Sequence, residues 1–358
     1  MGNSLSWGYS RITEWLRKER QKGQSSYQAV FFGLPKLLVL RSYRQLAAGI
    51  NASPVNYNIN LVNFTRFQHR HHRALGGHFY IIVLPGTLHF LTPCLELLPA
   101  NLSVFLILNG TQEWENAYLK QKFSNRPSFK LATLPHSSLA HGRVLNLLLE
   151  NNQQNFGILD HDLYIFSAHV FDQLALNYNQ YALGAFELSN KKAGISFPTT
   201  HFLYFNTRLV KKIMHKYRID ARQYKRILPQ LEEDLSKMNL GHHNYLKEYL
   251  NYFDTMNLIM AMAHHEGMAA GTLKSSVEDI YHIGGTSYGS DSIYATYLNL
   301  KLLELPVNSG LKEKQSNLRA NFKRSSDVLA KIPDSASSLE TIARINHFTS
   351  LVGKKTQK

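Results

Sequence analysis

The chain has 358 residues, of which 44% are hydrophobic, so it can build a sizeable core, and wholesale disorder is excluded. Its formal net charge is +15 at pH 7, and its single cysteine, Cys94, excludes an intramolecular disulfide framework. The charge is concentrated at the two ends. Residues 1–50 contain eight basic and two acidic residues, and residues 306–358 contain ten and four. We therefore expect the ends to meet anionic partners such as nucleic acid or an anionic membrane surface.

The first 75 residues are predicted to form a basic helical N-terminal extension. Trp7, Ile12 and Leu16 approximate one face of a helix with basic residues beside it. This pattern fits either a short helix in a membrane interface or a helix packed on its own domain. The extension ends in the histidine-rich run 66–73. We interpret this run as a solvated basic connector, because no acidic or cysteine partner for a metal is near.

No stretch of the sequence approaches 18 uninterrupted apolar residues. The best run, 29–40, contains Gly33, Pro35 and Lys36, so it cannot span a bilayer as an ordinary helix. It also lies too far into the chain to be a signal peptide. We therefore expect a cytoplasmic protein that is not secreted and has no transmembrane helix. A peripheral position at the inner face of the membrane, reached through the basic ends, stays open.

Apolar strands and helices alternate in short units from residue 76 onward. Strands are expected at 79–84, 103–108, 129–132 and 156–159, and helices at 87–98, 114–123 and 141–150. Continuous apolar runs bounded by turn residues are typical of the buried strands of a parallel sheet. The alternation therefore predicts an α/β fold with a doubly wound sheet.

The second half of the chain has a less regular pattern. It is expected to be strand-like at 195–205, mostly helical at 209–248, helical at 254–264 and a short strand at 278–282. The remainder is predicted to be helical, with a flexible break at 335–338 and a loose basic tail after Val352. The expected division is an N-terminal extension (1–75), a catalytic domain (76–290) and a helical C-terminal extension (291–358).

Asp160-His161-Asp162 follows the apolar strand 156–159 and carries the strongest chemical signal. Ligands of open α/β sheets bind outside the carboxyl ends of the strands. Two acids separated by one residue can point the same way in an extended chain and offer hard oxygen ligands to Mg²⁺ or Mn²⁺. Charges between apolar runs need a partner, and a bound cation would provide one.

The order of four motifs resembles that of a GT-A type glycosyltransferase of the broad family 2 kind. The motifs are a strand ending at Pro85, a second strand ending in a polar turn at Asn109, the glycine-x-x-x-asparagine spacing of Gly142 and Asn146, and the strand followed by Asp160-His161-Asp162. The resemblance covers roughly residues 78–290. It implies a GT-A (Rossmann-like) open mixed sheet flanked by helices, with helical N- and C-terminal extensions. It also implies a nucleotide-sugar site that includes Pro85, Asn109, Glu113, Gly142, Asn146, Asp160, Gly284 and Gly285.

Two downstream motifs extend the resemblance. His282, before a glycine-rich loop, is expected to complete a Mn²⁺ or Mg²⁺ site with Asp160 and Asp162, or else to cap a strand end. Asp254, before an apolar helix, matches the position of the general base in inverting members. Glu266 is a rival for that role, and Asp254 could instead cap its helix.

The sequence also departs from the family pattern. The turn after the second strand carries Asn109, where an acid often contacts the nucleotide base, and Glu113 follows four residues later. This leaves the identity of the base open. Phe253 stands before Asp254, where the family usually has another acid. The stretch 199–202 could line a sugar or acceptor pocket or simply begin a strand.

The resemblance implies a metal-dependent hexosyltransferase-like enzyme. It would move a sugar from a nucleotide-diphosphate sugar to a hydroxyl of a glycan or glycolipid acceptor, with inversion, in the synthesis of a surface glycan or polysaccharide. A nucleic-acid-binding protein is one alternative, but the charge lies at the ends and no nucleic-acid module is present. A nucleotidyltransferase is another, but the loop 84–88 after the first strand lacks a basic residue.

Overall fold

The computed structural model describes residues 34–71, 76–190, 193–240, 253–284, 292–311, 314 and 324–357. The chain divides into two compact units, residues 1–56 and 57–358. The predicted helix around Trp7 lies outside the described residues, as does Gly285. Among the helices of the described ranges, none combines the length and the apolarity that crossing a membrane requires.

Helices are present in the described part of the N-terminal extension, as predicted. Helix α3 (Leu34–Asn51) belongs to the smaller unit. Helix α4 (Pro54–Arg70) begins there, with proline in its first turn, and continues into the larger unit. Phe64 and Phe67 of α4 are buried, and the Phe64 ring lies 5.1 Å from that of Phe129. These aromatic side chains attach α4 to the core of the larger unit.

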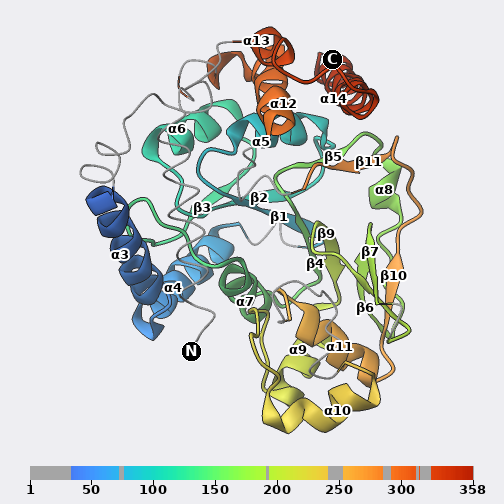
Figure 1. Ribbon diagram of the computed structural model, residues 1–358. Coiled ribbons are helices and arrows are strands. Elements are labelled where there is room, and N and C mark those ends of the chain that lie inside the picture. The colour runs from blue at the N-terminus through green and yellow to red at the C-terminus, as the bar shows by residue number, and fades with distance from the viewer. Residues whose placement is uncertain are drawn as a thin grey trace. The chain divides into compact units, whose positions relative to one another are not determined.

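A seven-stranded mixed sheet in the order β10-β6-β9-β4-β1-β2-β3 forms the centre of the larger unit (Figure 1). Strands β1, β2, β3 and β4 are parallel to one another, β9 is antiparallel to both β4 and β6, and β10 is parallel to β6. The predicted α/β fold, with an open mixed sheet flanked by helices, is confirmed. The strands are β1 (His78–Val83), β2 (Val104–Leu108), β3 (Ser128–Lys130), β4 (Phe156–Leu159), β6 (Gln180–Gly184), β9 (Phe202–Phe205) and β10 (Ala269–Thr272).

Helices cover both faces of the sheet, and the side chains of β1 alternate between them. Tyr80 and Ile82 face one core and Phe79 and Ile81 face the other. The first core is formed with α4, α7 (His141–Asn151), α9 (Thr207–Tyr217) and α11 (Asn257–His265), and the second with α5 (Leu88–Leu97), α6 (Glu113–Lys122) and α12 (Ile293–Leu303). Because both faces are covered, the strand ends remain as the place where a ligand can enter.

Two small antiparallel ribbons and several short helices complete the larger unit. Strand β5 (Leu163–Ile165) pairs with β11 (Ile280–His282), and β7 (Glu187–Asn190) pairs with β8 (Ile195–Pro198). The short helices are α8 (His169–Asp172), α10 (Glu232–Lys237) and α13 (Ser325–Leu329). The β5–β11 ribbon matters most for function, because β5 follows Asp162 directly and β11 carries His282.

The predicted flexible break at 335–338 and loose tail after Val352 are wrong. Ser335 caps helix α14 (Ala336–Thr356), because its side chain accepts a hydrogen bond from the backbone N–H of Ser338 at 3.2 Å. The helix then continues past Val352, which is fully buried. The serine-rich run is therefore a helix start and not a linker.

Candidate active site

The parallel part of the sheet reverses its winding direction between β1 and β4. From β1 the chain passes to β2 and β3 on one side, then returns through α7 to β4 on the other side. In open α/β sheets, ligands bind outside the carboxyl ends of the strands at such a reversal. Pro85 follows β1, Asn109 follows β2 and Asp160 follows β4, so these three residues lie at this edge.

The Asp160 carboxylate lies close to the imidazole rings of two histidines. Its Oδ2 atom lies 3.1 Å from His201 Nδ1 and 3.7 Å from His282 Nε2. The antiparallel pairing of β9 with β4 sets Phe202 opposite Leu159, which brings the preceding His201 beside Asp160. One ligand atom from each of Asp160, His201 and His282 lies within 4.8 Å of the others. The three residues could therefore hold a metal ion.

The two imidazole rings stack on each other. Their centroids are 3.6 Å apart and their planes differ by 27°. Imidazole nitrogens are common metal ligands, so the stacked pair places two donor side chains at one point of the site. Desolvation opposes ionisation of Asp160, but the hydrogen bond with His201 and the field of His141 outweigh it and lower the pKa of this carboxyl.

Asp162 is buried and approaches the same nitrogen of His282 as Asp160 does. Its Oδ1 atom lies 3.3 Å from His282 Nε2, and its Oδ2 atom accepts a hydrogen bond from the Gly284 N–H at 3.2 Å. Its carbonyl oxygen accepts a further bond from the Ile283 N–H at 3.3 Å. Gly284 has a φ of +74°, which glycine adopts without strain. Asp162 therefore orients His282 and holds the loop that follows it.

His282 lies on a three-residue strand that is held by its neighbours. Pairing of β11 with β5 sets His282 opposite Leu163, directly after the Asp160–Asp162 motif. Tyr281 stacks on Phe348 of α14, with ring centroids 4.6 Å apart. The C-terminal helix thus supports the strand that carries His282.

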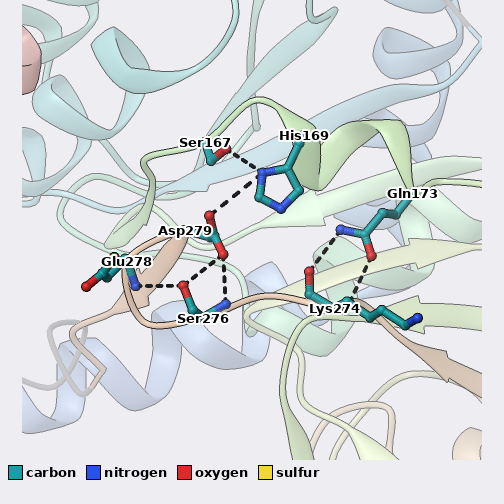
Figure 2. Close-up of polar contacts among 7 residues, drawn as sticks. All are labelled: Ser167, His169, Gln173, Lys274, Ser276, Glu278 and Asp279. Atoms are coloured by element: carbon teal, nitrogen blue, oxygen red, sulfur yellow. Dashed lines mark hydrogen bonds and ion pairs between the residues drawn. The ribbon is translucent and has the colours of Figure 1, made fainter.

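Polar contacts also anchor the loop that leads into β11 (Figure 2). The Gln173 side chain donates to the Lys274 carbonyl at 3.0 Å and accepts from the Lys274 N–H at 2.9 Å. Asp279 lies 3.7 Å from His169 Nδ1, and Ser167 contacts the same nitrogen. Because both partners approach Nδ1, they do not form a relay through the ring. These contacts hold the loop before β11 in place, and none of them involves Asp160, His201 or His282.

A buried carboxylate ties the loop after β1 to the loop after β2. Glu115 accepts one backbone hydrogen bond from Gly86 and one from Gln112, each at 2.7 Å. Burial raises the pKa of Glu115, and the two N–H donors oppose this shift. Pro85, a predicted nucleotide contact, is exposed in the turn that Glu115 holds.

The other predicted nucleotide contacts of this edge have packing partners. The buried Asn109 amide donates to the Leu139 carbonyl at 2.9 Å and accepts from the Leu139 N–H at 2.7 Å. Asn146 accepts from the Ala221 N–H at 2.7 Å. A Cβ on Gly142 would lie 2.5 Å from the Ala221 carbonyl oxygen. These residues position the start of α7 between the end of β2 and the segment at Ala221.

His141, the first residue of α7, is a site residue that the sequence analysis missed. Desolvation lowers its pKa, while the negative charges of Asp160 and Asp254 oppose this shift. Its ring therefore lies in the electric field of both acids. It stands directly before the predicted motif residue Gly142, which is the signal that could have identified it.

The two candidate bases have different surroundings. Asp254 Oδ1 accepts hydrogen bonds from the Gln223 side chain and the Thr255 N–H, each at 2.8 Å. Glu266 follows α11, lies 2.6 Å from Lys216 Nζ and contacts the Tyr217 hydroxyl. These contacts lower the pKa of Glu266, so it is stabilised as an ion. Of the two acids, only Asp254 contributes to the field at His141.

The structure brings together Asp160, Asp162, His282 and Gly284, four of the predicted site residues. Glu113, by contrast, is exposed and paired with Lys130. His201 was expected from the sequence only as a pocket residue, whereas it contacts Asp160 directly. The pairing of β9 with β4 produces this contact, and only a prediction of that pairing could have revealed it.

Residues 56–210 match the family described as the StrH glycosyltransferase N-terminal domain. This region extends from α4 to α9 and includes the edge that carries Asp160, Asp162 and His201. No curated protein matches the chain. The family match supports a glycosyltransferase; His282 lies beyond it.

Several solved glycosyltransferase structures are similar to the chain at low sequence identity. GlyE of Streptococcus pneumoniae TIGR4 is 16% identical, with a TM-score of 0.33 over 56% of this chain and 45% of that one. The chain thus spans less than half the length of GlyE. The mannosyltransferase PcManGT of Pyrobaculum calidifontis, in complex with GDP-Man and Mn²⁺, is 10% identical, with a TM-score of 0.32 over 84% of this chain and 96% of that one. TarS of S. aureus is 12% identical, with a TM-score of 0.28 over 78% and 53%.

Proposed function

We propose that the protein is a metal-dependent glycosyltransferase. It transfers a hexosyl group from a nucleotide-diphosphate sugar to a hydroxyl of a glycan or glycolipid acceptor, with inversion, in surface glycan synthesis. The observation that carries the proposal is the convergence of His201 and His282 on Asp160 at the carboxyl edge of the sheet. The match of residues 56–210 to a glycosyltransferase domain supports the reaction class.

The donor atoms fit a divalent cation. Neighbouring ligands of an octahedral ion at about 2.1 Å are about 3 Å apart. Asp160 Oδ2 lies 3.1 Å from His201 Nδ1, and His282 Nε2 lies 3.3 Å from Asp162 Oδ1. Asp160, His201 and His282 would hold the ion, with Asp162 beside them. Of the two expected ions, two imidazoles favour Mn²⁺ over Mg²⁺, which prefers oxygen ligands.

The reaction requires that negative charge on the leaving nucleoside diphosphate be offset. A bound Mn²⁺ or Mg²⁺ would supply positive charge at this place. Helix α7 directs its positive N-terminal end toward the same edge, beginning at His141. The flexible backbone of Gly284 lets the chain approach a phosphate closely. Gly285, outside the described residues, is proposed to assist it.

Asp254 is proposed as the general base that takes the proton from the acceptor hydroxyl. Its hydrogen bonds from Gln223 and Thr255 fix its orientation, and its charge acts on His141 at the same edge of the sheet. Glu266 is less suited, because Lys216 and Tyr217 already engage its carboxylate. A single displacement with Asp254 as base inverts the anomeric centre.

A scan of nucleotide-diphosphate sugars with Mn²⁺ tests this function, with release of nucleoside diphosphate as the readout. One or a few donors should give release, and Asp160→Asn should abolish it. Asp334→Asn, an exposed acid outside the site, should retain full activity. Circular dichroism checks that both variants fold. Full activity of Asp160→Asn, or no release and no binding with any donor, would refute the proposal.

A further inference from the structure

Residues 20–95 form a segment with eight lysine and arginine residues and no aspartate or glutamate. Helices α3 and α4 are the described helices that lie wholly inside it, together with most of α5. Strand β1 and most of α5 are buried, so the surface of this segment comes mainly from α3 and α4. Their exposed cations, Arg44, Arg66 and Arg70, can attract anionic partners.

Helix α4 has a buried face and an exposed apolar face. Phe64 and Phe67, with Asn60, point into the core. On the opposite side, Ile59 is 46% exposed and Val62 is 48% exposed. Residues 59, 62 and 66 repeat at helical spacing, so Arg66 continues the same outward stripe. The stripe combines the aliphatic side chains of Ile59 and Val62 with the cation of Arg66, and all three are exposed.

The basic end of this stripe borders a hollow. Its lining combines α4 with β3 and includes Asn63, Arg66, His69, Arg70, Ser128 and Lys130, together with the buried rings of Phe67 and Phe129. Lys130 is paired with Glu113, while Arg66 and Arg70 belong to the acid-free segment. Guanidinium groups with amide and hydroxyl groups between them suit the phosphate oxygens of a headgroup.

Helix α3 of the smaller unit also exposes aliphatic side chains. Val39, Leu46 and Ile50 are 68%, 62% and 43% exposed, at spacings that set them on one side of the helix. Arg44 is exposed on the same helix. Arg44 lies on another side of α3 from these aliphatic side chains, so the two helices share only the exposed aliphatic stripe.

We propose that the outward face of α4 docks onto an anionic lipid bilayer. Ile59 and Val62 enter the boundary between headgroups and acyl chains, and Arg66 and Arg70 bind headgroup phosphates. A nucleic acid fits less well, because the exposed apolar side chains of the stripe, Ile59 and Val62, are aliphatic, and the phenylalanine rings that line the hollow are buried and offer no face on which a base could stack. The proposal does not depend on the glycosyltransferase activity.

Flotation of the full chain with vesicles tests the proposal. Phosphatidylglycerol vesicles should carry the protein upward and phosphatidylcholine vesicles should not, and added salt should weaken the binding. Arg66→Gln with Arg70→Gln should lower the partition about twenty-five-fold, at about fivefold for each basic residue. Ile59→Ser with Val62→Ser should lower it by about tenfold or more.

The matched control is Val277→Ser with Leu339→Ser, which removes exposed aliphatic side chains outside the acid-free segment. This variant should float like the wild type, and melting curves confirm that all variants fold. Equal flotation with both lipids, unchanged flotation of the α4 variants, or equal loss in the control would overturn the proposal. So would tight binding to DNA or RNA that depends on Arg66 and Arg70 without binding to either vesicle.

Discussion

His201 and His282 stack their imidazole rings 3.6 Å apart at the Asp160 carboxylate. One ring comes from the residue before β9 and the other from β11, so a strand of the main sheet and a separate ribbon both supply the site. Two imidazole rings beside a carboxylate form a preorganised donor set. The stack is therefore the feature that most directly supports the proposed metal-dependent chemistry.

Removal of the His201 ring should weaken metal binding. His201→Ala takes away one donor and leaves Asp160 and His282 in place, so Mn²⁺ affinity should fall by about tenfold or more. Isothermal titration of the full chain with Mn²⁺ measures the change. His169→Ala is the matched control, because this histidine anchors the loop shown in Figure 2 and is not part of the Asp160 cluster. Equal losses in the two variants would contradict a specific role for His201.

Replacement of the proposed base should slow turnover without loss of metal. Asp254→Asn keeps the size of the side chain but removes its basicity, so kcat should fall by about 10²-fold to 10⁴-fold. Mn²⁺ affinity should stay close to that of the wild type. Glu266→Gln is the parallel variant, and its kcat should change little, because its carboxylate is engaged by Lys216 and Tyr217. The assignment fails if the two variants exchange these results.

Gly142 should not tolerate a side chain. A Cβ at this position would lie 2.5 Å from the Ala221 carbonyl oxygen and 2.7 Å from Arg222 Cα, so the backbone must move. We expect Gly142→Ala to lower the free energy of unfolding by about 1–3 kcal/mol. Gly49→Ala is the control, because nothing lies within 4 Å of its Cβ position in α3. That substitution should be neutral or stabilising by up to about 1 kcal/mol, as chemical denaturation can measure.

His78 should make the fold sensitive to acid. Burial lowers the pKa of His78 to about 4, although its hydrogen bond with Asn152 opposes the shift. Its Nδ1 accepts from the Gly76 N–H at 3.1 Å, so protonation would break this bond. Above pH 6.5 the ring is neutral in both the folded and the unfolded chain. Between pH 6.5 and 4 only the unfolded chain gains the proton, so stability falls as the pH falls.

The size of this effect follows from the shift. The wild type should lose about 3 kcal/mol between pH 6.5 and pH 4 because of His78 alone. His78→Gln lacks the titrating group, so its unfolding free energy should fall by that much less over the same range. Urea denaturation at several pH values compares the two proteins. If the unfolding free energies of the two proteins changed equally with pH, His78 would not be the cause of the acid sensitivity.

The continuously apolar strands were predictable, because burial on both faces leaves a clear pattern. Residues 156–159 were predicted as a strand and form β4. Strand β10 was missed because its sequence, Ala269–Thr272, has little strand propensity, and its structure depends on pairing with β6. The run 335–338 was misinterpreted because serine is common both in linkers and at helix starts.

The candidate site was predictable where a family motif and the end of a strand coincide. Asp160, Asp162 and His282 were expected near one another, and His282 Nε2 lies 3.7 Å from Asp160 Oδ2 and 3.3 Å from Asp162 Oδ1. His201 lies 3.1 Å from Asp160 because two strands pair in antiparallel register. Local patterns do not encode which distant strands will pair, so this ligand could only be found from the structure.

The short strand β11 directs two neighbouring side chains to different partners. Its side chains alternate, so Tyr281 stacks on Phe348 while the next residue, His282, points toward Asp160. A slip of one residue would exchange their places, sending the imidazole into the aromatic contact and the phenol into the carboxylate cluster. Docking of the Tyr281 ring against α14 therefore keeps the His282 side chain directed toward the acids. Helix α14 therefore helps to fix the register of β11, and with it the position of His282, in addition to its packing role.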